Sequence, residues 1–179
     1  MRSYVALGDF EEQNLSSAGD MNKLRWDCGL ESLAEQAIVD CPENPPSEYP
    51  TNGVNYRFYG RNTSFFTLRN SLQAAVLEWT SIEDMNWSTS NLFDGNPASR
   101  NVANMIRATT TALGCSENRC EFSASAACVF SQPGIQAGTL IYTSGSPCQN
   151  DNECTSYSPA LCDSGLCVNA ARPTAEGPL

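Results

Sequence analysis

Nine cysteines and no histidine occur in the 179 residues of this chain, and these two counts decide most of its possible chemistry. Cysteine thiols can form disulfides, act as nucleophiles or bind metal ions. Histidine is the commonest general acid or base near neutral pH and the commonest zinc ligand, so its absence removes both roles. The many cysteines indicate an oxidising compartment and a disulfide-stapled fold. Together the counts favour a secreted protein that acts through its surface.

The charge balance is strongly acidic, with 20 Asp and Glu against 10 Lys and Arg and a net charge of −10. Phosphate groups would be repelled, so we expect neither nucleic acid nor an anionic membrane as a partner. No apolar run reaches the roughly 18–20 residues of a membrane span, so we expect no membrane insertion. We expect Met1 to be an expression start in place of a natural leader. Three N-glycosylation sequons, at Asn14, Asn62 and Asn86, agree with an extracellular location.

Apolar periodicity predicts a mixed α and β fold. Residues at three- and four-residue steps predict three helices, over about residues 20–40, 64–83 and 97–112. Pro97 suits the first turn of the third helix. Short runs around Gln132-Pro133-Gly134 predict antiparallel strands, over residues 121–131 and 138–143, with a weaker strand signal at 56–58.

The composition changes from Gly145, where four cysteines fall among Asn, Asp, Ser and Gly residues. This segment has too few apolar residues for a core of its own. We therefore expect a main domain over residues 1–144, a disulfide-rich extension over 145–168 and a flexible tail over 169–179.

Residues 21–34 contain the string Met-x-x-Leu-x-Trp-Asp-Cys-x-Leu-Glu-x-x-Ala. This string resembles the first long helix of the CAP superfamily (cysteine-rich secretory, antigen-5 and pathogenesis-related proteins), in particular its nematode branch of Ancylostoma-secreted and venom-allergen-like proteins. Further matches to this branch occur at residues 2–8, 113–115, 127–130 and 141–148. The resemblance covers about residues 2–168. It implies an α+β fold, a three-layer α-β-α sandwich with a small cysteine-rich C-terminal extension.

CAP proteins usually carry two histidines and two glutamates around a central cleft that can bind zinc. In the matching motifs of this chain, one histidine position is Asn101 and one glutamate position is Val54. The helix glutamate position is Ile82, with Glu83 one step further round the helix, and the motif tryptophan is Arg107. We therefore expect a degenerate cleft with no catalytic residue, no zinc or other cofactor and no enzymatic activity. A cleft lined by acidic side chains could still bind a hard cation weakly.

The family pattern implies two disulfides, Cys41–Cys120 and Cys115–Cys128. The late cysteines would form two more bridges, whose pairing the spacing cannot decide, among Cys148, Cys154, Cys162 and Cys167. Cys28 is left over. It is either a buried free thiol on the first helix or, in the sharper interpretation, a reactive or intermolecular thiol.

Leu7, Gly8 and Asp9 form a tripeptide like those that integrins recognise, in which an aspartate carboxylate binds the integrin's metal ion. A short acidic tripeptide is more often an ordinary transition from helix to loop. Relatives in blood-feeding hookworms are reported as antagonists of platelet and leukocyte integrins. The resemblance therefore implies a secreted, non-catalytic parasite effector that binds a host cell-surface or plasma protein, with an integrin as the suspected partner.

An alternative function is extracellular binding of sterols or fatty acids, to which CAP proteins have been linked. An exposed apolar groove for such a ligand would use aromatic side chains, namely Tyr56, Phe58, Tyr59, Phe65, Phe66 and Trp87. The commoner interpretation is that Phe65 and Phe66 begin a helix and fill the core.

Overall fold

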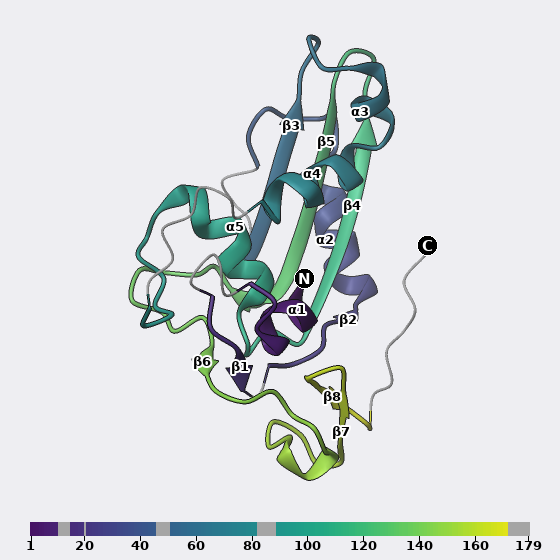
Figure 1. Ribbon diagram of the computed structural model, residues 1–179. Helices are drawn as coiled ribbons and strands as arrows, with labels where there is room; N and C mark the ends of the chain where they lie inside the picture. The colour runs from purple at the N-terminus through teal and green to yellow at the C-terminus, as the bar shows by residue number, and fades with distance from the viewer. Residues whose placement is uncertain (11–14, 20, 46–50, 82–88, 172–179) are drawn as a thin grey trace. The chain divides into compact units, whose positions relative to one another are not determined.

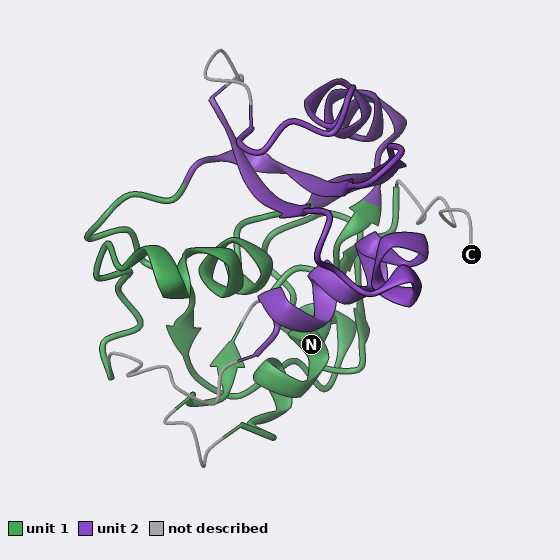
Figure 2. Cartoon of the chain, turned by 90° about the horizontal axis from the view of Figure 1, so that it is seen from above, with its two compact units in different colours: residues 1–25, 82–111, 135–179 green, residues 26–81, 112–134 purple. Residues whose placement is uncertain are grey.

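The computed structural model describes residues 1–10, 15–19, 21–45, 51–81 and 89–171. The chain divides into two compact units, which have different colours in Figure 2. Unit 1 combines residues 1–25, 82–111 and 135–179, and unit 2 combines residues 26–81 and 112–134. The cysteine-rich residues from 145 onward are thus part of unit 1.

Unit 2 is built on a sheet whose long strands are β3 (Asn52–Tyr59), β4 (Ala112–Arg119) and β5 (Ala124–Pro133). β5 lies in the middle, and both neighbours run antiparallel to it. The two-residue strand β2 (Arg25–Trp26) pairs with the outer edge of β4. Residues 124–130 of β5 are all buried. This burial explains why their sequence is a nearly continuous run of small and apolar residues instead of an alternating one.

Helices cover both faces of this sheet (Figure 1). On one face α2 (Cys28–Ala37) places Ala34 and Ala37 against Ala127 and Val129 of β5. On the other face lies α4 (Ser71–Trp79), preceded by the short helix α3 (Phe65–Arg69). The Tyr59 hydroxyl of β3 donates a hydrogen bond of 2.9 Å to Glu78 of α4. Unit 2 therefore has three layers, in the order helix, sheet, helix.

Unit 1 has less regular structure around its own apolar core. Its helices are α1 (Arg2–Leu7), α5 (Pro97–Ile106) and the 3₁₀ helix η2 (Asp151–Glu153). Its short strands pair as β1 (Ala18–Gly19) with β6 (Thr143–Ser144) and as β7 (Ala160–Asp163) with β8 (Leu166–Asn169). The core collects fully buried side chains from most of these segments, including Val5, Phe93, Val102, Ile106, Ile135 and Tyr142.

Arg2 ties α1 to the loop that follows α5. Its guanidinium donates hydrogen bonds of 2.8–3.4 Å to five backbone carbonyls, those of Asn22, Met105, Arg107, Ala108 and Thr110. Burial lowers the pKa of Arg2 to about 9, so the side chain stays protonated at neutral pH. The C-terminal carbonyls of a helix carry partial negative charge, which stabilises a cation placed there.

Four disulfides staple the chain, two in each unit. Unit 2 contains Cys41–Cys120 and Cys115–Cys128, the two bridges that the family resemblance implies. Unit 1 contains Cys148–Cys162 and Cys154–Cys167, which resolve the pairing that the sequence left open. Cys28 is free and exposed, so the interpretation as a buried thiol is wrong.

The structure corrects several predicted helices. The helix predicted from about residue 20 is α2, which begins only at Cys28, because Arg25 and Trp26 join the sheet and Asp27 accepts the capping hydrogen bonds of α2. The predicted helix over 64–83 is interrupted at Asn70. The third helix ends at Ile106, and residues 112–119 form β4.

The predicted strands also shift. β3 spans eight residues where only 56–58 were expected, and β5 begins at Ala124. The strand predicted over residues 138–143 does not form as a partner of β5. Thr143 instead begins β6, and β6 pairs with β1. In the part of the chain that the structure describes, no helix has the length and apolar character needed to cross a membrane.

Candidate functional site

The residues aligned with the family's cleft lie on separate elements. Val54 lies on β3 of unit 2, half-buried, and its side chain packs against the apolar cluster under α2. Asn101 lies half-buried on α5 of unit 1. Ile82 and Glu83 fall outside the described residues. A valine has no ligand atom and the chain has no histidine, so these positions do not fit the zinc that the family can bind.

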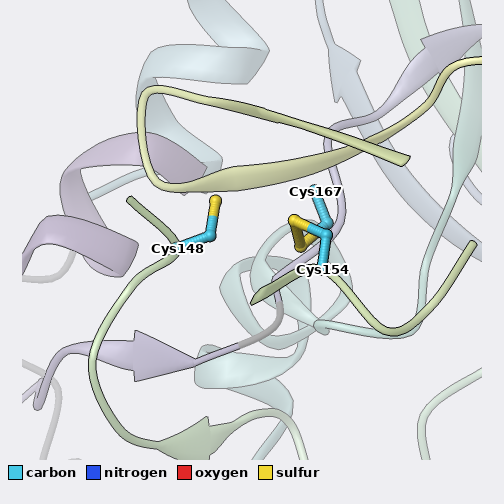
Figure 3. Close-up of side chains that lie close together, drawn as sticks. All are labelled: Cys148, Cys154 and Cys167. Carbon is cyan, nitrogen blue, oxygen red and sulfur yellow. A yellow bond between two sulfur atoms is a disulfide. The ribbon is translucent and has the colours of Figure 1, made fainter. Parts of the chain in front are cut away.

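One group of potential metal ligands converges among the described residues. The sulfurs of Cys148, Cys154 and Cys167 lie within 4.8 Å of one another (Figure 3). Cys154 is bonded to Cys167 with an S–S distance of 2.02 Å, and Cys148 is bonded to Cys162. Metals bind the thiolate, and all three sulfurs here are in disulfides. The group is therefore a structural staple of unit 1.

The Leu7-Gly8-Asp9 tripeptide forms the turn that ends α1. Gly8 adopts the left-handed conformation, with φ 84°, which suits glycine at a helix C-terminus. Its N–H donates to the Val5 carbonyl at 3.1 Å, and the N–H of Asp9 donates to the Tyr4 carbonyl at 2.9 Å. The backbone of the tripeptide is thus held by two hydrogen bonds.

The side chains of this turn face solvent. Leu7 is 50% exposed, and Asp9 is also exposed. The tripeptide therefore sits in a hydrogen-bonded turn after a helix, a more constrained place than the apex of an open loop.

The aromatic residues proposed for an apolar groove differ widely in their exposure. Phe65 and Phe66 are 62% and 74% exposed, so the interpretation that they fill the core is wrong. The guanidinium carbons of Arg69 and Arg119 lie 5.4 and 5.0 Å from the centre of the Phe65 ring. Tyr59 is buried, and Trp87 lies outside the described residues.

Of the three sequon asparagines, the structure describes Asn62 alone, because Asn14 and Asn86 lie outside the described residues. Asn62 is exposed in the turn between β3 and α3. Its glycosylation stays a prediction.

Unit 1 also contains a pocket of about 570 Å³ that the sequence analysis missed. Its lining includes Gly19 and Asn22, residues 107–109 and 139–143, and Ser156. The one sequence feature that pointed to this region was Arg107, which stands where the family motif has a tryptophan. The segments that form the pocket are far apart in the sequence, so periodicity could not bring them together.

Comparisons with known proteins agree with the resemblance seen in the sequence. The model of the family "CAP: Cysteine-rich secretory protein family" matches residues 2–130. Ancylostoma secreted protein of Ancylostoma caninum is 26% identical over 172 residues, which cover 93% of this chain and 40% of that protein. Hookworm platelet inhibitor 1, also of Ancylostoma caninum, is 27% identical over 144 residues, which cover 80% of this chain and 66% of that protein.

The fold agrees as well. The crystal structure of Na-ASP-1 superposes with a TM-score of 0.82 at 24% identity and covers 98% of this chain and 44% of that one. The likeness shows an α+β CAP fold with a helix-sheet-helix sandwich and a small C-terminal region that holds several disulfides. The chain spans less than two thirds of the length of these two relatives. On the family match and the shared fold together, this chain belongs to the CAP family of cysteine-rich secretory proteins.

Proposed function

We propose that this chain is a secreted, non-catalytic effector that binds a host protein and antagonises platelet or leukocyte integrins. CAP family proteins with several disulfides are typically secreted, and the family has no established catalytic activity. The relationship to a hookworm platelet inhibitor supports a host-protein partner. The single observation that carries the integrin proposal is the exposed turn of Leu7, Gly8 and Asp9.

The geometry of this turn supports recognition through a carboxylate. The two backbone hydrogen bonds and the left-handed Gly8 constrain the backbone of the turn. A pre-organised loop loses less conformational entropy on binding than a flexible one. Asp9 can then present its carboxylate to a partner's metal ion while exposed Leu7 adds apolar contact.

The experiment measures adhesion of platelets and of leukocytes to integrin ligands in the presence of the purified, glycosylated protein. We expect inhibition by the wild-type protein and at least about tenfold weaker inhibition by Asp9→Asn, because the substitution removes a metal-binding charge and keeps the side-chain shape. Asp40→Asn is the matched control, since Asp40 is an exposed aspartate in the turn that follows α2 in unit 2.

Two results would contradict the proposal at different levels. An absence of inhibition at micromolar protein would count against integrin antagonism as a whole. Full inhibition by Asp9→Asn would remove the tripeptide from the mechanism and leave host-protein binding in place.

The alternative proposal, a sterol or fatty-acid carrier, would need a groove lined by the aromatic residues. Tyr59 is buried, and the guanidinium groups of Arg69 and Arg119 lie near the Phe65 ring. These positions do not support an apolar groove built from the two rings. Purified protein that carries no extracted lipid and fails to solubilise labelled sterol would contradict the carrier function.

A further inference from the structure

We propose that one end of unit 2 is a docking surface for an acidic segment of a partner protein. Three exposed phenylalanines and three exposed arginines form it, and we call it the α3 surface: Phe65, Phe66, Phe122, Arg61, Arg69 and Arg119. It lies in unit 2, whereas the tripeptide of the proposed integrin antagonism lies in unit 1. The inference therefore adds a second binding surface and does not rest on the tripeptide.

The strand register brings these side chains to the same end of the sheet. The ends of β3 and β4 are both level with Ala124, the first residue of β5. Arg61 follows β3, and Phe122 lies in the connection from β4 to β5. The helix α3 lies beside this end (Figure 1), and the centre of its Phe65 ring is 5.0 Å from the guanidinium carbon of Arg119.

The aromatic side chains of the α3 surface face solvent. Phe65, Phe66 and Phe122 are each at least half exposed, and the other phenylalanines of the chain are half-buried or buried. A large apolar side chain in water contributes binding free energy when a partner covers it. Arginine and aromatic residues are enriched in protein–protein interfaces, where lysine is depleted. The α3 surface has this composition, because its three cations are all arginines.

The arginines of the α3 surface are held against the rings and keep their polar donors free. Arg69 and Arg119 lie over the Phe65 ring, and Arg61 lies 4.5 Å from the centre of the Phe122 ring. In the part of the chain that the structure describes, no ion pair or hydrogen bond engages these three guanidinium groups. A guanidinium over a ring can still donate in its own plane to a carboxylate.

Other cations of the protein contrast with these three. Arg57 forms an ion pair with Glu78, and Lys23 forms one with Asp163. Arg2 donates to five backbone carbonyls. Arginines without a polar partner are thus grouped at the α3 surface, where a partner's carboxylates would find unused donors.

The local charge at the α3 surface opposes the charge of the whole protein. The segments that carry it, residues 60–70 and 117–123, contain three arginines and two glutamates, whereas the chain has 20 acidic and 10 basic residues. Glu117 accepts hydrogen bonds from the Ser71 hydroxyl at 2.8 Å and from the Leu72 N–H at 2.6 Å, so it is engaged by the first turn of α4. Glu121 forms no ion pair with the arginines among the described residues. An acidic partner therefore complements this surface.

A protein segment suits the α3 surface better than two other anionic partners. A sulfated glycan presents its charges on a polar chain and would leave the phenyl rings uncovered. An anionic membrane is repelled by the net charge of −10. A segment that combines carboxylates with apolar side chains covers both the arginines and the rings.

The test selects peptides from a random library displayed on phage. The library is first depleted on the Arg69→Gln and Arg119→Gln double variant and then retained on the immobilised wild-type protein. We expect the retained peptides to be rich in Asp and Glu next to aromatic or aliphatic residues. A synthetic copy of a retained peptide should bind less tightly as the salt concentration rises, because exposed charges are screened.

Single variants locate the binding. Arg69→Gln and Arg119→Gln should each weaken binding of the synthetic peptide about tenfold, because each removes one charge-assisted contact. Phe66→Ala should weaken it about fivefold or more through lost apolar contact, and this side chain is exposed, so the fold does not depend on it.

Two further variants serve as controls. Arg100→Gln removes an arginine of unit 1 whose guanidinium also lies over a ring, 5.3 Å from the centre of Phe93, and it should leave peptide binding unchanged. Asn62→Gln removes the sequon beside Arg61. Because it clears any glycan from this end of the surface, it should bind the peptide at least as tightly as the wild-type protein.

The proposal is overturned if the selection retains no peptide, if the retained peptides are not enriched in Asp and Glu, or if the arginine variants keep wild-type affinity. Arginine-dependent binding of heparin or of phosphatidylserine vesicles without any retained peptide would also overturn it, and would assign the surface to a glycan or a lipid. Asp9→Asn should bind the peptide as the wild-type protein does. Failure of this proposal and failure of integrin antagonism can therefore be told apart.

Discussion

At the scale of single residues, Tyr59 combines a buried ring with a carboxylate partner. Its hydroxyl is buried and donates to Glu78 at 2.9 Å, while Arg57 forms an ion pair with the same carboxylate at 2.7 Å. Burial and the neighbouring Glu78 raise the pKa of Tyr59 to about 12. The phenol in an unfolded chain ionises near pH 10. The folded state therefore holds its proton more tightly than the unfolded state does.

This difference predicts a pH-dependent loss of stability. The contribution of Tyr59 is complete below about pH 10 and is lost as the pH rises from about 10 to 12, because the unfolded chain releases the proton first. Tyr59→Phe should lack this component of the pH dependence. Short-exposure urea unfolding at several pH values, together with absorbance titration of the phenolates, measures it.

The exposed Tyr4 provides the control, since Tyr4→Phe removes a phenol without removing a buried hydrogen bond. Identical alkaline profiles for the wild-type protein and Tyr59→Phe would show that the interaction with Glu78 does not couple to folding.

At the scale of elements, the approach of β4 to α2 decides how tightly the first layer packs on the sheet. Gly114 of β4 lies so close to α2 that an added Cβ atom would stand 2.0 Å from the backbone nitrogen of Glu31. Backbone cannot move aside as a flexible side chain can. The glycine is therefore required by contact between two elements.

We expect Gly114→Ala to reduce the free energy of unfolding by at least about 1–3 kcal/mol, because the methyl group forces β4 and α2 apart. Gly134→Ala is the matched control at the end of the same sheet, where an added Cβ would find its nearest atom 4.0 Å away. Urea unfolding measures both variants. Equal midpoints for the two would contradict the close packing of β4 on α2.

At the scale of the whole molecule, the disulfides divide evenly between the units. Each unit has two bridges, and each bridge joins residues of the same unit. Disulfides stabilise chiefly by restricting the unfolded chain, typically by about 2–4 kcal/mol each. In unit 1 both bridges lie within residues 148–167, so they staple the cysteine-rich segment around its own small cluster. Eight of the nine cysteines are used in this way.

The remaining cysteine gives a direct test of the pairing. We expect one maleimide-reactive thiol per chain, accessible without denaturation because Cys28 is exposed, and none in Cys28→Ser. Mass spectrometry of labelled protein, native and denatured, provides the count. Additional thiols that label only after denaturation would show that one of the four bridges is absent.

The sequence alone predicted properties that depend on residue identity. The nine cysteines allow disulfides, and the absence of histidine excludes the two cleft histidines of the family, whatever the fold. The family motifs identified the α+β sandwich, and Pro97 marked the start of α5 correctly, because proline fits the first turn of a helix.

Only the tertiary structure decided the features that arise from long-range contact. Residues 112–119 become β4 because β5 supplies their hydrogen bonds and α2 covers them, an influence that local periodicity does not carry. The observed start of α2, at Cys28, differs from the predicted start for a similar reason, because Arg25 and Trp26 form β2 and pair with β4 before the helix begins. The pocket beside Arg107 needs segments more than a hundred residues apart, which are brought together by burial of the core of unit 1 and by the hydrogen bonds of Arg2.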